Sequence, residues 1–583
     1  MNVSILALVA LPLFFLAFRF YSRYLSKRYG EDPKRPTPAI EFNDGKDYCP
    51  TKTPVVFGHH FASIAGAGPI LGPTIALLYG VVPVWLWIIL GGILIGAVHD
   101  YTTLFASLRE KGKSIAEIAK KSLGDTGFAL VIAFTIIMIV LVTSAFLVAS
   151  ARALTSLVPL KILGLPPSQT IFKTVIKNGV EMGKIGGIAS MSAIVITALA
   201  PILGYLNYKR KASVAITAPL AIGIALFSVF IGIHHPVSLP QRTWMVLLAS
   251  YSFIAAGIPV WLILQPRDYT NVFILYGGII FLVIATFSAG ISGVRIGAPL
   301  FNVHQGISRL GLIWPFLFVI VACGAISGFH ALVAGGTSAK QVTSERSARL
   351  IGYGGMLLES ILAIGVIAAI SAGIAFKDYL GIVFPAKVGA SNPILGFALG
   401  MGGLLNKGLG IPFSYGSIFG ILMVEGFIAT TLDTAVRLNR YLFEELWGII
   451  FKGRVPGIMR YYLFNSGLSV VIMLFLALTN AFLAIWPIFG TANQLLAALT
   501  LITLTVWLIL TKRKAIFTAI PAGFMLVTTL FSLIFLFKRY LTTHNTILLV
   551  ADAGLFLLAI ALTWVAVKTF RRLRESIRDS QAM

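Results

Sequence analysis

Runs of about 20 apolar residues follow one another along almost the whole chain, and short polar segments separate them. A helix needs roughly 20 consecutive apolar residues to cross the hydrocarbon core of a bilayer. The pattern therefore predicts an all-α polytopic membrane protein with about 15 transmembrane helices, near residues 3–21, 56–79, 84–104, 127–150, 187–206, 214–233, 244–264, 272–290, 312–334, 351–372, 412–436, 463–486, 490–510, 516–537 and 546–567.

The second run, from Phe57 to Tyr79, is interrupted in its middle by the sequence AGAGP at 65–69. Gly and Pro weaken helices, and lipid offers no hydrogen-bond partner to free backbone groups. Irregular backbone at this depth is tolerated only inside protein or beside a polar cavity. The interruption therefore predicts a binding cavity.

A similar interruption, AAGIP at 255–259, lies in the seventh run, between Ser250 and Asp268. Helices five spans apart run in opposite directions, as in transporters built from inverted repeats. We therefore predict two core repeats, with an N-terminal part before them and a C-terminal part after them: 1–54, 55–238, 239–440 and 441–583. The alternative is that membrane helices simply tolerate more Gly and Pro than soluble helices.

Composition agrees with the membrane class, because 57% of the 583 residues are hydrophobic and 11% are charged. The net charge of +25 arises from Lys and Arg in short loops, where they set topology, so we do not expect a nucleic-acid partner. Their distribution predicts an outside N-terminus and a cytoplasmic C-terminus. The first run lacks a basic region before it, so we expect a retained helix. The two cysteines, Cys49 and Cys323, imply no disulfide framework.

Ionisable residues inside a membrane are costly and point to function. His59 and His60 precede the first interruption, Asp100 lies at the end of the third run and Glu359 lies in the tenth. We predict that these four residues carry protons, with His60 as the first candidate. An interfacial cap or a zinc site with Cys49 are the alternatives for the histidine pair.

Two further sets of residues have candidate roles. Arg267 and Asp268 follow Pro266 at the end of the seventh run and could form a gate, or could only set topology. Ala334, Thr337 and Ser338 have the i, i+3, i+4 spacing of one helical face and could offer oxygen ligands to Na⁺, although small hydroxyl residues more often pack helices together.

Four long motifs resemble the carbon starvation protein A family: GHHFASIAGAGPILGP, VHDYTTLFASLREKGKSI, IPVWLILQPRDYTN and FGTANQLLAAL. The resemblance implies a transporter of the bacterial or archaeal inner membrane that carries peptides, or in some members pyruvate, with protons. It also implies a LeuT-like core of five plus five helices. Carried onto this sequence, that core has its unwound segments at the two interruptions, which assigns substrate binding to Ser63, Ala65, Gly66, Ala67, Gly68, Ser252, Ala255, Ala256 and Gly257.

The sequence thus predicts a secondary active importer of small carboxylates, with short peptides as the main class and protons as the driving ion. Partial positive charge at the half-helix ends would receive the substrate carboxylate. The alternatives are a symporter for pyruvate, another monocarboxylate or an amino acid, and coupling to Na⁺. An intramembrane metalloenzyme and a nutrient sensor are rival classes, but we expect no enzymatic activity and no cofactor.

Overall fold

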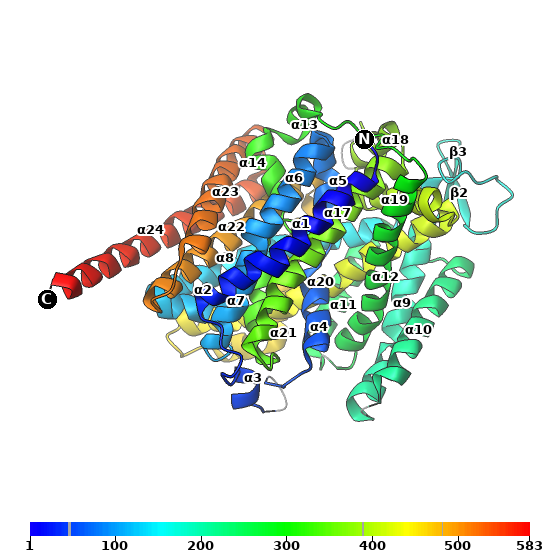
Figure 1. Ribbon diagram of the computed structural model, residues 1–583. Coiled ribbons are helices and arrows are strands. Elements are labelled where there is room, and N and C mark those ends of the chain that lie inside the picture. The colour runs from blue at the N-terminus through cyan, green and yellow to red at the C-terminus, as the bar shows by residue number, and fades with distance from the viewer. Residues whose placement is uncertain (45–47, 211, 260, 387–389, 481, 583) are drawn as a thin grey trace.

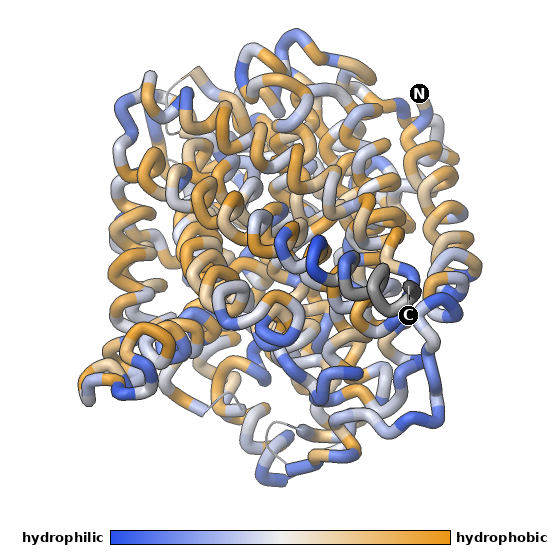
Figure 2. The backbone as a smooth tube through the Cα atoms, turned by 90° about the vertical axis from the view of Figure 1, so that its left-hand side faces the viewer, coloured by the Kyte–Doolittle hydropathy of each residue, from blue (hydrophilic) through white to orange (hydrophobic). Residues whose placement is uncertain are grey.

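The computed structural model describes residues 1–44, 48–210, 212–259, 261–386, 390–480 and 482–582. Nearly all of them form helices that run side by side between two ends of the molecule (Figure 1). We call the end that holds α3 (Pro38–Glu41) the α3 end, and the opposite end, with α13 (Val303–Leu310), the α13 end. Hydrophobic residues fill the band between the two ends, and hydrophilic residues gather at both (Figure 2). This is the distribution that a bilayer imposes.

The first half of the chain forms a series of long helices and one interrupted helix. These are α1 (Ser4–Leu16), α2 (Ser22–Tyr29), α4 (Thr53–Ile64), α5 (Gly68–Ala76), α6 (Val81–Gly91), α7 (Ala97–Arg109), α8 (Ile115–Leu154), α9 (Ile185–Gly204), α10 (Val214–His234), α11 (Gln241–Gly257) and α12 (Leu264–Ile291). Short π-helical turns continue α1 into α2 and α6 into α7.

The second half continues in the same way and ends in four long helices. It comprises α14 (Ile313–Ile320), α15 (Phe329–Gly336), α16 (Glu345–Ala348), α17 (Gly355–Gly373), α18 (Phe376–Val383), α19 (Pro393–Leu409), α20 (Phe413–Ile450), α21 (Tyr462–Thr479), α22 (Phe482–Leu510), α23 (Ile516–Thr542) and α24 (Thr546–Ala582).

By length and composition, 12 helices in the described residues can cross a membrane, or up to 14 when each of two bent helix pairs is counted as one span. The three predicted spans missing from the twelve are 56–79, 244–264 and 312–334. The first is the interrupted α4 and α5, the second is the 17-residue α11, and the third is α14 and α15, which have eight residues each. The predicted number of about 15 spans thus exceeds these 12 helices, because two of the three missing spans are broken and one is short.

Two segments between the spans have structure of their own. Residues 158–183 form a small antiparallel sheet with the strand order β1 (Val158–Pro159), β3 (Val180–Gly183), β2 (Thr174–Lys177). Residues 376–409 contain α18 and α19, and α19 packs between α17 and α20. Gly400 and Gly403 allow this approach, because a Cβ at Gly400 would lie 3.0 Å from the backbone of Ala369.

The centre of the molecule is built on α8, which packs along α20 and α22. Ser114 and Glu117 cap its first turn reciprocally, as the S-x-x-E spacing predicts. Gly124 has φ of 80°, a conformation that favours glycine, and bends the helix after this first segment. The long straight part of α8 that follows is buried and forms one wall of the central site.

Candidate functional site

The interruption predicted in the second span is present. The helix α4 ends at Ile64, α5 begins at Gly68, and the two helices are bent by 45° relative to each other. Residues 65–67 between them are buried, and no side chain caps the start of α5 in the described structure. A helix N-terminus with partial positive charge therefore lies inside the protein.

A second interrupted helix, α14 and α15, crosses the first one with its irregular segment 321–328. A Cβ at Gly68 would overlap the side chain of Cys323, and one at Gly72 would lie 2.7 Å from the carbonyl oxygen of Ile320. Towards the α3 end, His60 Nδ1 lies 2.7 Å from Ser338 Oγ. The two interrupted helices thus run in opposite directions, and their breaks meet.

The helix α22 forms hydrogen bonds with segment 321–328 and with the helix ends on either side of it. The amide N–H of Phe329 donates to Asn493 Oδ1 at 3.0 Å, and that of Gly328 donates to the carbonyl of Asn493. The side chain of Gln494 donates to the carbonyl of Phe318 at 2.5 Å, and Trp486 donates to that of Ile320 at 3.4 Å. The motif FGTANQLLAAL, for which no role was predicted, therefore stabilises an unwound segment at membrane depth.

A chain of ionisable side chains lies beside the crossing point of the two breaks, and all of them are fully buried. His99 Nδ1 and His330 Nδ1 each lie 2.7 Å from one oxygen of Asp100. His330 Nε2 lies 3.2 Å from Glu359 Oε2. The chain joins α7, α15 and α17, and His330 is the residue that connects the two acids.

This chain, which we call the His330 cluster (His99, Asp100, His330 and Glu359), holds two carboxyl groups and two imidazoles, so it is electroneutral only when two protons are bound among the four groups. A protonated His330 balances one carboxylate and leaves the other uncompensated. An isolated charge at this depth is strongly disfavoured. With His330 protonated, the cluster is therefore electroneutral only when one further proton is bound, on His99 or on a carboxyl group.

Of the predicted proton carriers, the structure brings Asp100 and Glu359 together through His330. His60 lies on α4 beside them, where a Cβ at Gly355 would be 3.4 Å from its ring. His59 is only half-buried, and its carbonyl accepts a hydrogen bond from Ser63 Oγ at 2.8 Å. The hydroxyl of Ser63 is thus engaged within its own helix.

The predicted second interruption at 255–259 is displaced from the first. The helix α11 does end at Gly257, but Arg437 donates to the carbonyls of Ala255 and Ile258, and Arg440 donates to that of Ala256. The side chain of Tyr462 covers Gly257, and Ser252 is buried on α11.

These arginines lie about two turns further along α20 than Thr431, which packs against Gly66. At its end, α11 presents carbonyls within 255–258 to the guanidinium groups of Arg437 and Arg440. The segment that packs directly against the first break is 321–328. The Gly and Pro pattern of the sequence did not predict an interruption at 321–328, because this segment contains no Pro.

Arg267 and Asp268 at the start of α12 have partners inside the helix bundle. Arg267 Nη2 lies 2.9 Å from Asp433 Oδ2, and Arg267 Nη1 donates to the hydroxyl of Tyr251 at 2.6 Å. Asp268 accepts from Thr430 Oγ1 at 2.8 Å. The two residues of the predicted gate are therefore bound to side chains of α11 and α20.

The candidate sodium ligands do not share a helical face. The helix α15 ends at Gly336, so Thr337 and Ser338 follow its end, while Ala334 lies within it. The hydroxyl of Ser338 is also bound to His60. For the zinc alternative, the described residues contain no group of three or more His, Cys, Asp or Glu that could hold a metal ion.

Comparison with known proteins identifies the family. A profile described as carbon starvation protein CstA matches residues 2–392 and 383–532. The chain belongs to the CstA family. It is 31% identical to the peptide transporter CstA of Escherichia coli strain K12, with 91% of this chain and 80% of that protein aligned.

Other relatives have related names. The pyruvate/proton symporter BtsT of the same organism is 30% identical, with 91% of this chain and 81% of that protein aligned. The crystal structure of MhsT in complex with L-phenylalanine is 12% identical and has a TM-score of 0.42, over 88% of this chain and 98% of that one. The CstA family relatives are thus named as transporters.

Within this CstA family member, sequence reasoning missed His330, Asn493 and Gln494. His330 could have been recognised as a candidate functional residue, because it is an ionisable residue inside an apolar run. Asn493 and Gln494 were weaker candidates, because they are two polar amides in the middle of a long apolar helix. What could not be read was the partner of each, because these contacts join segments that are far apart in the sequence.

Proposed function

We propose that the protein is a secondary active transporter that imports small carboxylates, with short peptides as the main class, by proton-coupled alternating access. The His330 cluster beside the crossing breaks is the observation that carries this proposal. Membership of the CstA family supports it, since relatives are named as a peptide transporter and as a pyruvate/proton symporter.

In this mechanism the substrate carboxylate binds at the start of α5, where backbone N–H groups and the helix dipole favour an anion. Binding of a proton to the His330 cluster changes its charge at the same crossing point. Substrate and proton thus act on the same pair of interrupted helices.

We propose that α4–α5 and α14–α15 are the matching elements of two inverted repeats. The following helices, α6–α7 and α16–α17, also run in opposite directions, and each contains a π-helical segment, at Gly92–Gly96 and Arg349–Gly354. This pairing moves the start of the second repeat from residue 239 to the beginning of α14. Such repeats are the basis of alternating access in many transporters.

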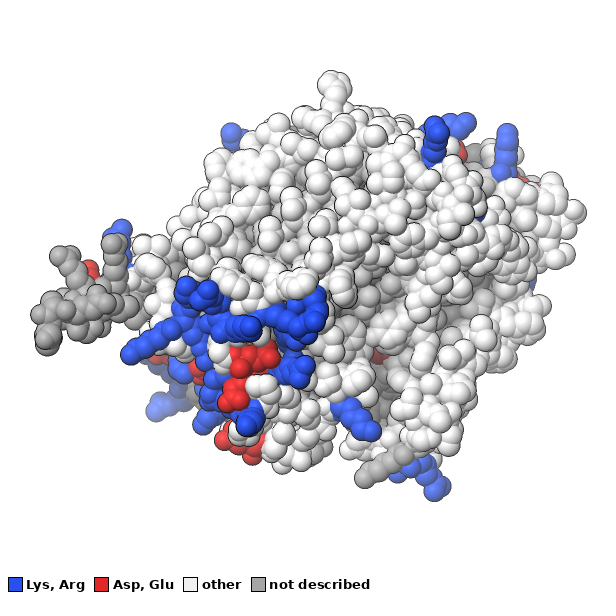
Figure 3. Space-filling model, viewed as in Figure 1, with Lys and Arg blue, Asp and Glu red and all other residues white. Residues whose placement is uncertain are grey.

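We further propose that the α3 end faces the cytoplasm of a bacterial or archaeal cell, which leaves the N-terminus outside. Figure 3 shows a dense group of Lys and Arg near this end and fewer at the α13 end. Exposed members include Arg23, Lys27, Arg28, Lys34, Arg35, Lys111 and Lys512. A basic face of this kind is typical of the cytoplasmic side.

The test is uptake into proteoliposomes that contain the purified protein. Labelled dialanine, pyruvate and alanine are supplied under an imposed proton gradient or, separately, a sodium gradient. We expect accumulation of at least one substrate under the proton gradient, and loss of that accumulation with a protonophore. No accumulation of any of the three under either gradient would rule out the proposed function.

A further inference from the structure

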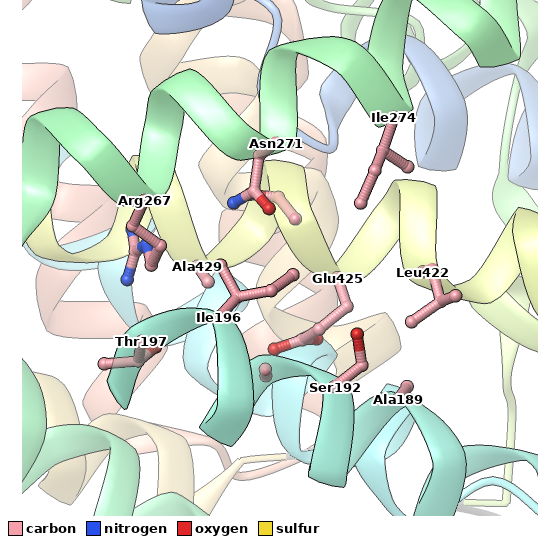
Figure 4. A pocket seen from close by; sticks show the side chains of 12 residues that line it. Ala189, Ser192, Ile196, Thr197, Arg267, Asn271, Ile274, Leu422, Glu425 and Ala429 are labelled. Carbon is pink, nitrogen blue, oxygen red and sulfur yellow. The ribbon is translucent and has the colours of Figure 1, made fainter. Parts of the chain in front are cut away.

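Two cavities of the described structure differ in size and in charge. The one between α9, α12 and α20 has a volume of about 30 Å³, room for about one water molecule, and presents both a base and an acid, Arg267 and Glu425 (Figure 4). The other, of about 300 Å³, lies at the α13 end between α13, α22 and α23. Two arginines, Arg309 and Arg539, line it, and none of its described lining residues is an Asp or Glu. Binding pockets for small molecules begin at about this size.

This larger cavity, which we call the outer cavity, connects the exposed end of the molecule with both interrupted helices. Arg309 and Arg539 are exposed, whereas Ile75 and Ile320, which also line it, are buried. Ile320 is the last residue of α14, directly before the unwound segment. Ile75 follows Gly68 by seven residues on α5, which is about 10 Å at 1.5 Å per residue. The buried end of the outer cavity thus lies about two helical turns from the first break.

The two arginines have donors available for a ligand. Arg309 Nη1 donates to the carbonyl of Phe384 at 2.8 Å, and Phe384 lines the same cavity. Neither Arg309 nor Arg539 forms an ion pair with an acidic side chain in the described part of the chain. A guanidinium group has five N–H donors in a planar fork that matches a carboxylate. Two such groups around one cavity attract anions and repel cations.

We propose that the outer cavity binds the substrate carboxylate before the substrate reaches the crossing of the two breaks. Arg309 and Arg539 are its ligands at the exposed end. This inference rests on the proposed transport function and on the proposed outward orientation of the α13 end, and it adds an entry site to them. The phosphate of an anionic lipid has the same chemistry, so the test includes one.

The test measures the charge preference of a thiol placed in the outer cavity of the full chain. Leu483, which lines the cavity and is partly buried, is replaced by cysteine after Cys49 and Cys323 have been replaced by alanine. The purified protein reacts with an anionic, sulfonatoethyl methanethiosulfonate or with the cationic, trimethylammonioethyl reagent. We expect the ratio of the anionic to the cationic rate to be at least tenfold higher for Leu483→Cys than for free 2-mercaptoethanol.

Variants of the arginines in this labelled chain assign the preference to them. Arg309→Gln and Arg539→Gln should each lower the ratio at least threefold, whereas Arg539→Lys, which keeps the charge, should stay within twofold. Arg295→Gln is the matched control, because Arg295 is exposed at the same end and does not line the cavity. It should leave the ratio unchanged.

Substrate protection and uptake test whether the cavity is on the entry path. Saturating dialanine or pyruvate should slow the anionic reagent at least threefold at Leu483→Cys. In the otherwise unaltered protein, Arg309→Gln and Arg539→Gln together should raise KM for proton-driven uptake at least threefold and leave the maximal rate within twofold. The arginines lie far from the crossing, so they affect capture of the substrate and not its later movement.

Several results would overturn the inference. A rate ratio equal to that of the free thiol, or one that both neutral variants leave unchanged, would exclude an anion site. Protection by phosphatidylglycerol but by neither carboxylate would assign the arginines to a lipid headgroup. An unchanged KM in the double variant would remove the cavity from the entry path and leave proton-coupled transport intact. Absence of all wild-type uptake would contradict the proposed function itself, while the rate ratio would still decide whether the cavity attracts anions.

Discussion

At the scale of single residues, the account depends on His330. Its two ring nitrogens lie within 2.7 Å and 3.2 Å of Asp100 and Glu359, so one imidazole links two buried acids. The sequence predicted both acids as proton carriers from their depth alone. It could not predict their connection, because α7, α15 and α17 meet only in the folded protein.

Replacement of one acid by its neutral analogue separates proton coupling from substrate movement. In Glu359→Gln the cluster no longer binds the additional proton, so we expect proton-driven accumulation to fall at least tenfold. Exchange of labelled for unlabelled substrate without a gradient should remain within about threefold, since binding at the breaks is unchanged. Glu444→Gln, at a partly exposed acid of α20, should leave both activities at the wild-type level. Equal losses of exchange and accumulation in Glu359→Gln would contradict a coupling role.

At the scale of elements, close packing of the two interrupted helices requires glycine at the crossing. We expect Gly68→Ala to lower the melting temperature in detergent and to reduce transport, because its Cβ overlaps the side chain of Cys323. Gly223→Ala in α10 is the control, since a Cβ there meets nothing within 4 Å and alanine favours the helix. A Gly68→Ala protein as stable and active as this control would show that the breaks do not pack as described.

The unwound segment 321–328 depends on α22 in the same way. Asn493→Ala removes the acceptor of the Phe329 amide and should destabilise the protein by about 1–3 kcal/mol, the usual effect of leaving a buried group unpaired. Thermal unfolding in detergent measures this loss. Asn406→Ala, at an exposed asparagine, should change stability by less than about 0.5 kcal/mol. Similar melting temperatures for the two variants would leave α22 without its stabilising role.

At the scale of the whole molecule, the sequence was sufficient for the helical membrane class, the approximate number of spans and the break at 65–67. It did not show which break faces this one. Both 255–259 and 321–328 interrupt helices, but only long-range packing places the second at the crossing and the first against Arg437 and Arg440. The role of α22 could not be predicted for the same reason, because its hydrogen bonds join residues that are far apart in the sequence.

Orientation is a property of the whole molecule that labelling can test. Cysteines are introduced at exposed positions by Ser308→Cys at the α13 end and Lys34→Cys near the α3 end, in a chain where Cys49 and Cys323 are replaced by serine or alanine. We expect a membrane-impermeant maleimide to label the first in intact cells and the second only after permeabilisation. The reverse pattern would invert the proposed topology.

The most direct test of the central claim is to measure proton movement and substrate uptake in the same proteoliposomes, with a pH-sensitive dye trapped inside. Addition of dialanine or pyruvate to wild-type protein should acidify the lumen in step with uptake of whichever substrate it carries. In His330→Gln both signals should fall at least tenfold, while His235→Gln, at an exposed histidine, should match the wild type. Substrate uptake without lumenal acidification in the wild type, or undiminished acidification in His330→Gln, would contradict the account.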